Sequence, residues 1–143
     1  MKITMYGNGG AGNHGCEAIS RGTVQLLGKN EYQILSGSCQ EDAQYRLNSI
    51  AELVHATESK IKGISFLVAY AKMKLTGNYT DMDGLSYRSA IQRCTSNTDV
   101  ALSIGGDNYC YGNTALYAYL NRAFGRQGIK TVLWGCSIEP DVA

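Results

Sequence analysis

The sequence predicts an α/β fold in which a Rossmann-like parallel sheet carries helices on both faces. Short apolar runs alternate with segments of helical periodicity along most of the 143 residues. Three of those runs pass directly into glycine, at Gly7, at Gly105-Gly106 and at Gly135. Hydrophobic residues make up 44% of the chain and charged residues 17%, so a hydrophobic core can form without disulfides or a bound metal. We therefore expect one Rossmann-like domain over residues 1–143.

The apolar runs predict five strands, at 2–6, 32–35, 51–55, 100–104 and 130–134. The first helix is expected to start near Cys16 and to bury one face, made of Cys16, Ile19, Thr23, Leu26 and Leu27. A capping box at Ser38 and Glu41 predicts a brief helix to about Leu47. Further helices are expected over 60–76, 87–94 and 116–124, with a polar loop at 77–84. The helix over 60–76 is apolar on a wide surface, so we expect a buried or interfacial helix with more than one neighbour. The strand over 130–134 is of the central type.

Charge and cysteine content exclude several classes of protein. The net charge is +1 and no block of lysine or arginine stands out, so no nucleic-acid partner is expected. The five cysteines are scattered and form no CxxC pair, which predicts reduced thiols and no structural metal. The first strand begins at once, without a signal peptide, and no run is long and apolar enough for a transmembrane segment.

The stretch Gly7–Glu17 is the strongest local signal, because it joins a strand to a helix through glycines. Glycine lets a ligand approach the backbone, and a helix N-terminus offers N–H groups to an anion. Gly7, Gly9 and Gly12 also match the GxGxxG pattern of dinucleotide sites. That interpretation is disfavoured because the second strand ends in Leu35-Ser36-Gly37, without the acidic residue that would hold a ribose.

Each polar residue of this loop has two possible roles. His14 could bind an anion or move a proton, or it could only cap the turn. Glu17 suits the first helical turn, where a carboxylate complements the dipole, and could also bind a substrate. Asn8 and Asn13 are good turn residues and good hydrogen-bonding partners for a sugar or a carboxylate.

Asp107 is the sharpest single candidate for catalysis. It follows a buried strand and the pair Gly105-Gly106, so its carboxylate should project from the carboxyl end of the sheet. General acid–base chemistry on a sugar hydroxyl or an enol ether needs such a group, although loop N–H groups could equally occupy it. Tyr109 and Tyr111 flank this loop and could stack on a sugar ring or simply pack.

Three motifs taken together resemble the polysaccharide pyruvyl transferases. They are Gly-Asn-His-Gly-Cys-Glu-Ala-Ile at 12–19, Ser-Ile-Gly-Gly-Asp-Asn at 103–108 and Leu-Trp-Gly-Cys-Ser-Ile-Glu-Pro at 133–140. The resemblance implies transfer of pyruvate from phosphoenolpyruvate to a sugar hydroxyl of a surface polysaccharide, with no further cofactor. It implies a two-domain fold like that of the glycosyltransferase B enzymes, of which this chain would be the N-terminal half. The basic residues that bind phosphoenolpyruvate would then lie in a C-terminal half.

Combined with the residues above, this interpretation leads to a hypothesis for the site. Asp107 would be the acid–base group with His14 next in line, and the substrate would be bound by Asn8, Asn13, Gly15, Glu17, Gly105, Gly106, Asn108 and Ser137. The acceptor would be a glycan or a lipid-linked sugar, which implies a cytoplasmic location that extends to the inner face of the membrane. A homo-oligomer is also compatible with this interpretation.

Two readings of other classes stay open. One is a non-catalytic module that binds a nucleotide or a sugar phosphate, or that dimerises through a sheet edge. The other is half of a nucleotide-sugar glycosyltransferase, since that architecture is similar. The fold does not decide among the three.

Overall fold

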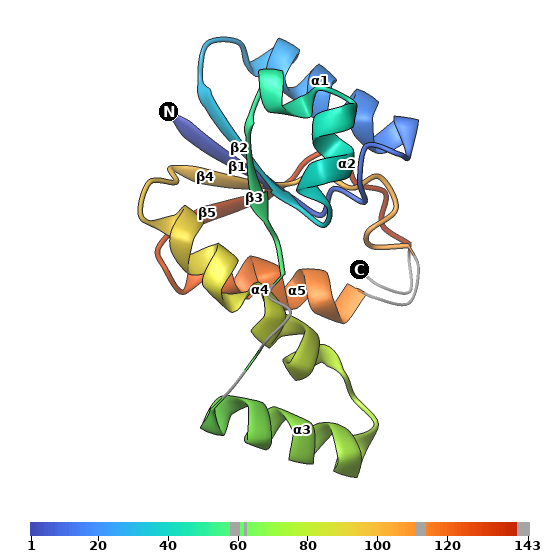
Figure 1. Ribbon diagram of the computed structural model, residues 1–143, viewed down its shortest axis with the longest axis vertical. Coiled ribbons are helices and arrows are strands. Elements are labelled where there is room, and N and C mark those ends of the chain that lie inside the picture. Colours follow the sequence, from blue (N-terminus) through green and yellow to red (C-terminus); the bar gives the residue numbers. More distant parts are fainter. Residues whose placement is uncertain (58–60, 62, 111–113, 140–143) are drawn as a thin grey trace.

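A five-stranded, all-parallel sheet forms the centre of the computed structural model, which describes residues 1–57, 61, 63–110 and 114–139 (Figure 1). The strand order is β3-β2-β1-β4-β5. The strands are β1 (Lys2–Tyr6), β2 (Glu31–Ser36), β3 (Glu52–His55), β4 (Val100–Ser103) and β5 (Lys130–Leu133). All four pairings are parallel, so the predicted α/β class is confirmed.

The helices lie on both faces of this sheet, as predicted. They are α1 (His14–Leu27), α2 (Cys39–Gln44), α3 (Ile64–Thr76), α4 (Thr80–Thr95) and α5 (Thr114–Gly125). In Figure 1, α1 and α2 cover one face, α4 and α5 cover the other, and α3 lies beyond α4. Neighbouring strand residues alternate between the faces: Met5 packs under α1, whereas Tyr6 packs among side chains of α4 and α5. Each face thus has its own apolar core.

The first two helices differ from their predicted extents in small ways. The helix α1 begins at His14, because Asn13 is its N-cap. Leu26 was expected on the buried face of α1, but its side chain is 77% exposed, so that prediction is wrong. Steps of 100° along the helix place Ser20 and Thr23 on the buried face and turn Leu26 away from it. The helix α2 ends at Gln44, ahead of a short 3₁₀ turn over Leu47–Ser49.

The prediction of a polar loop over 77–84 is wrong for most of that stretch. Gly77, with a φ of 68°, ends α3, and α4 already begins at Thr80. The side chain of Asn78 accepts a hydrogen bond of 2.8 Å from the backbone N–H of Thr80. Asp81 and Asp83 lie in the first turn of α4, where carboxylates favour a helix. The polar residues are thus the start of a helix.

The helix α3 begins at Ile64, while residues 60 and 62 of its predicted span lie outside the described residues. It contacts α4 but leaves most of its apolar surface exposed, so the expected second covering neighbour is absent from the described part of the chain. Only Ala69 is fully buried in this helix.

The last strand, β5, is at an edge of the sheet, which corrects its prediction as a central-type strand. Val132 and Leu133 are 40% and 43% exposed. Directly after β5, the indole N–H of Trp134 donates to Thr23 Oγ1 at 3.0 Å. This bond ties the end of β5 to α1.

Substituting Gly84 is expected to loosen the packing of α4 on α5. A Cβ at Gly84 would lie 2.5 Å from ring atoms of Tyr119. Gly84→Ala should therefore lower the free energy of unfolding by about 1 kcal/mol. The new methyl group clashes with a ring that can move only in part, and the higher helix propensity of alanine offsets some of that cost. Chemical denaturation measures this. In the matched Gly22→Ala change in α1, nothing lies within 4 Å of the new Cβ, so stability should stay equal or rise.

Candidate functional site

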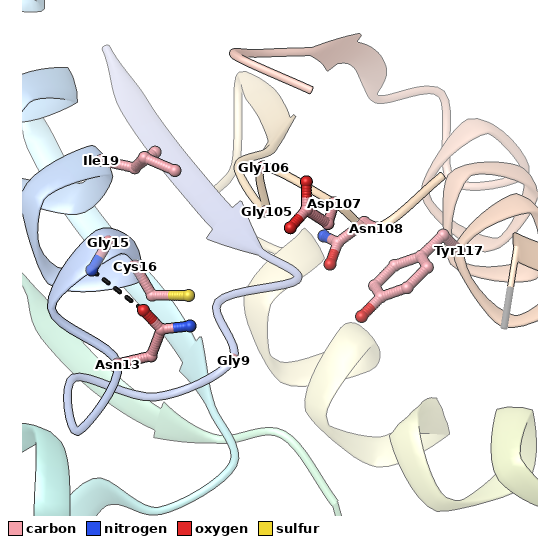
Figure 2. A pocket seen from close by; sticks show the side chains of 10 residues that line it. All are labelled: Gly9, Asn13, Gly15, Cys16, Ile19, Gly105, Gly106, Asp107, Asn108 and Tyr117. Carbon is pink, nitrogen blue, oxygen red and sulfur yellow. Dashed lines mark hydrogen bonds between the residues drawn. The ribbon is translucent and has the colours of Figure 1, made fainter. Parts of the chain in front are cut away.

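A pocket of about 370 Å³ opens at the carboxyl ends of β1 and β4 (Figure 2). It is lined by Gly9, Asn13, Gly15, Cys16, Ile19, Gly105, Gly106, Asp107, Asn108 and Tyr117. In Figure 2, Asn13 and Cys16 lie on one side, and Asp107, Asn108 and Tyr117 lie on the other. Two segments about ninety residues apart in sequence thus form one site, where an open parallel sheet is expected to bind its ligand.

The first wall is the loop between β1 and α1. Asn13 Oδ1 accepts a hydrogen bond of 3.0 Å from the N–H of Gly15, so this side chain caps α1. The capped end of α1 faces the pocket and contributes the partial positive charge of a helix N-terminus. The thiol of Cys16 projects beside it.

Carboxylates of α2 hold the rest of this loop. The N–H of Ala11 donates to Asp42 Oδ1 at 2.7 Å, and the N–H of Gly12 donates to Glu41 Oε1 at 2.8 Å. A Cβ on Gly12 would lie 2.2 Å from that same Glu41 oxygen, so a larger residue at this position would displace the end of the Glu41 side chain. Two N–H groups of the predicted anion loop are thus already bonded within the protein.

Sequence reasoning assigned Glu41 only to a capping box and did not single out Asp42. In the structure, Ser38 does cap α2 by accepting from the N–H of Glu41, but the Glu41 carboxylate turns to the glycine loop instead. No spacing along the chain signals this contact, because it joins two segments that only the fold brings together.

The second wall is the turn that follows β4. The side-chain amide of Asn108 donates to the carbonyl of Gly7 at 3.0 Å and so joins this turn to the first wall. A Cβ on Gly105 would lie 1.9 Å from the Asn108 amide nitrogen, which leaves room for glycine alone. Asp107 is exposed, and its carboxylate lines the pocket. Of the predicted site residues, the structure therefore gathers Asn13, Gly15, Gly105, Gly106, Asp107 and Asn108 at one pocket.

The third glycine-ended strand lies beside the second wall. The N–H of Ser137 donates to the carbonyl of Gly106 at 2.7 Å, and Ile138 forms a parallel bridge with Tyr109. The thiol of Cys136 donates to the carbonyl of Ser103 at 3.0 Å. Ser137 thus supports the Gly106 turn but does not line the pocket.

His14 and Glu17 belong to a different cluster. His14 Nδ1 lies 3.3 Å from Glu17 Oε2, and the other Glu17 oxygen accepts from Arg21 Nε at 2.8 Å. The imidazole also meets the ring of Tyr45 edge-on, with the centroids 5.7 Å apart. Neither His14 nor Glu17 lines the pocket that holds Asp107. The structure therefore does not bring together the two residues predicted to be catalytic.

Glu17 should make stability depend on pH on the acid side. Hydrogen bonds from Arg21, and then from His14, hold the pKa of the Glu17 carboxyl below its usual range. A depressed pKa adds stability that is present above the unfolded value of about 4.3 and is lost as the pH falls through the folded value. The difference in melting temperature between the protein and Glu17→Gln should accordingly shrink as the pH falls from about 5 to 3. The pH-dependent difference should be smaller in an Arg21→Gln background, and an undiminished difference there would contradict the leading role of Arg21.

Two tyrosines flank the second wall with different roles. Tyr109 is buried, and its hydroxyl donates to Ser103 Oγ at 3.1 Å, so it packs under the pocket and does not stack on a ligand. Tyr111 lies outside the described residues. Tyr117, which the sequence did not single out, lines the pocket, and burial raises the pKa of its phenol. Its hydroxyl therefore stays neutral near pH 7.

Asn8 lies under the loop and not in the pocket lining. Its residue is 8% exposed, and both polar atoms of its carboxamide lack a hydrogen-bond partner among the described residues. Four lining residues were not predicted as site residues: Gly9, Cys16, Ile19 and Tyr117. The glycine motif could have signalled Gly9, and the motif at 12–19 could have signalled Cys16 and Ile19, whereas nothing in the sequence signalled Tyr117.

The described lining of the pocket includes no lysine or arginine. Within the described residues, no cluster of three or more histidine, cysteine or acidic side chains could hold a metal ion, and no helix has the length and apolarity to cross a bilayer. The five cysteines are free thiols. Searches among family models, curated proteins and solved structures found no match for this chain.

Proposed function

We propose that this chain is part of a pyruvyl transferase that acts on a glycan, and that it forms the side of the active site that carries the acid–base group. The observation that carries the proposal is that the two motifs at 12–19 and 103–108, far apart in sequence, meet as facing walls of one pocket. Both motifs are part of the resemblance to the polysaccharide pyruvyl transferases. The pocket also presents a carboxylate among amide and hydroxyl groups, which is a suitable surface for a sugar with free hydroxyls.

Asp107 is the group we assign to proton transfer. It would accept the proton of the acceptor hydroxyl as that oxygen attacks the central carbon of phosphoenolpyruvate, and would return a proton to the methylene carbon. Phosphate would then leave, and a second hydroxyl would attack the same carbon and pass its proton to the released phosphate, which closes the ketal. A catalytic role for His14 would require its ring to leave Glu17 and Tyr45, so we assign both proton transfers to Asp107.

The phosphate of the donor is the group that this pocket is least suited to bind. Within the described pocket lining, only the N-terminus of α1 offers positive charge, and that is a partial charge. Tight binding of phosphoenolpyruvate would require cations from outside this pocket lining. The pocket is accordingly better suited to the sugar acceptor than to the donor.

That same lack of cations favours a second candidate, a module that binds sugar without catalysis. A chain of this kind would bind a neutral sugar with a vicinal or 1,3-diol and would release no phosphate. The half-glycosyltransferase reading predicts instead a preference for a nucleotide sugar.

Two measurements separate these readings. Thermal shift should show stabilisation by a neutral glycan fragment. Proton NMR of a mixture with phosphoenolpyruvate in large excess, which offsets weak donor binding, should show the new methyl signal of a pyruvate ketal. Sugar binding without a ketal signal would support the binding module, and selective stabilisation by a nucleotide sugar would support the glycosyltransferase. No response to any of the three ligands would overturn the proposal.

A further inference from the structure

The outer surface of α3 is apolar, and no other described part of the chain covers it. Ile64, Leu67 and Leu75 are 80%, 63% and 87% exposed, and Val68 and Tyr70 are exposed beside them. In Figure 1, α3 lies at the end of the molecule farthest from α1. Contiguous apolar patches of more than a few hundred Å² are uncommon on monomers and mark interaction sites.

A basic groove continues from this apolar surface. A hollow of about 340 Å³ between α3 and the pair α4 and α5 is lined by Ile64, Ser65, Val68, Ala69, Asp81, Leu85 and Tyr119. Leu85 and Tyr119 also line a second hollow of about 310 Å³ between α4 and α5. That second hollow presents Arg88, Arg126, Gln92 and Gln127. Apolar and cationic groups thus form one continuous surface, here called the α3 surface.

The charges of the α3 surface are mostly unbalanced. Among the described residues, neither Arg88 nor Arg126 forms an ion pair. The Nζ atom of Lys74 lies 5.6 Å from the centre of the Tyr70 ring. Lys72 is paired, at 2.6 Å, with Asp81, and α3 itself carries no acidic residue. The surface is therefore cationic although the whole chain has a net charge of only +1.

We propose that the α3 surface docks on a bilayer that contains anionic phospholipids. The apolar side chains of α3 would enter the boundary between headgroups and acyl chains, as interfacial helices do. Arg88 and Arg126 would meet lipid phosphates, and Lys74 would extend its charge past Tyr70 to the headgroups. The inference does not depend on the proposed pyruvyl transfer, since none of these residues lines the catalytic pocket.

The charge distribution favours a bilayer over a second copy of the chain. In a twofold dimer the same patch faces itself, so the unpaired cations of both copies would be brought together. Asp81 and Asp83 are the carboxylates at this end of α4, and Asp81 is already paired with Lys72. An anionic lipid surface offers the complementary charge and an apolar interior at the same place.

Cosedimentation of the 143-residue chain with vesicles tests this inference. The chain should bind vesicles of phosphatidylcholine and phosphatidylglycerol in equal parts and should bind phosphatidylcholine alone far more weakly. Each basic group near such a surface contributes roughly fivefold in affinity, so Arg88→Glu with Arg126→Glu should weaken binding by about 25-fold or more. Leu67→Ser with Leu75→Ser should also weaken it by at least about tenfold, because two buried side chains are lost.

Matched controls sit on other surfaces. Lys29→Glu with Lys130→Glu changes the net charge equally, and Leu26→Ser removes an exposed leucine of α1. Both should keep wild-type binding, and circular dichroism should show that all variants fold. Absence of vesicle binding by the unmodified chain, or equal losses in the control variants, would overturn the inference. So would a dimer in sedimentation velocity that the α3 variants dissolve while vesicle binding stays absent.

Discussion

Asp107→Asn should lower the rate of ketal formation by at least about 100-fold while leaving the fold intact. General acid–base groups usually contribute 10²-fold or more, and an amide can neither take nor return the proton. Asp107 is exposed at the pocket, so the substitution removes no buried contact. The measurement is the initial rate of ketal formation by NMR, with the melting temperature as a check on folding.

Asp83→Asn is the matched control, because it makes the same change on the exposed first turn of α4. It should keep the full rate. Asp107→Asn activity within about tenfold of the unmodified protein would remove Asp107 from the mechanism. In the sugar-binding reading, the same substitution would weaken sugar binding without any rate to lose.

Gly105→Ala should cost about 2 kcal/mol of unfolding free energy, because the new methyl group collides with the Asn108 side chain. Its Cβ would lie 2.2 Å from both Cγ and Oδ1 of Asn108 as well as 1.9 Å from the nitrogen. Asn108 cannot easily move aside, since its amide holds the carbonyl of Gly7. Thermal or denaturant unfolding measures the loss, which corresponds to roughly 8 °C in a chain of this size.

The neighbouring glycine provides the control. A Cβ at Gly106 meets only the end of Ile19, at 3.7 Å, so Gly106→Ala should be tolerated. Combining Gly105→Ala with Asn108→Ala should cost less than the sum of the two single changes, because the second substitution removes the group that the first one strikes. Strict additivity would show that the two residues do not touch.

Much of the fold could be predicted because it depends on local patterns. The runs at 2–6 and 100–104 are short, apolar and followed by glycine, and the structure pairs them side by side in parallel. The helix of residues 116–124 was readable from apolar residues at helical spacing, and Leu116, Leu120 and Phe124 are indeed buried. The polar start of α4 was missed, because asparagine and aspartate suit both a loop and a helix N-terminus.

The candidate site could also be predicted only in part. Glycine-ended strands of a parallel sheet must open on one edge, so the sequence placed Asn13, Gly105 and Asp107 together at the pocket. It also paired His14 with Asp107, but the fold turns His14 toward Glu17 and Tyr45. The carboxylates of Glu41 and Asp42 on the glycine loop, and the Asn108 bond to Gly7, were not readable from any local spacing.

By itself the sequence determined the α/β class, the parallel sheet and the edge at which its glycine turns gather, because periodicity and turn residues act over short spans of chain. Only the tertiary structure decided which polar groups share a pocket, which N–H groups are already bonded and that α3 is left uncovered. Those outcomes depend on side chains from distant segments, such as Glu41 against Gly12 and Asn108 against Gly105. Contacts of that kind are set by the packing of whole elements, which no local pattern encodes.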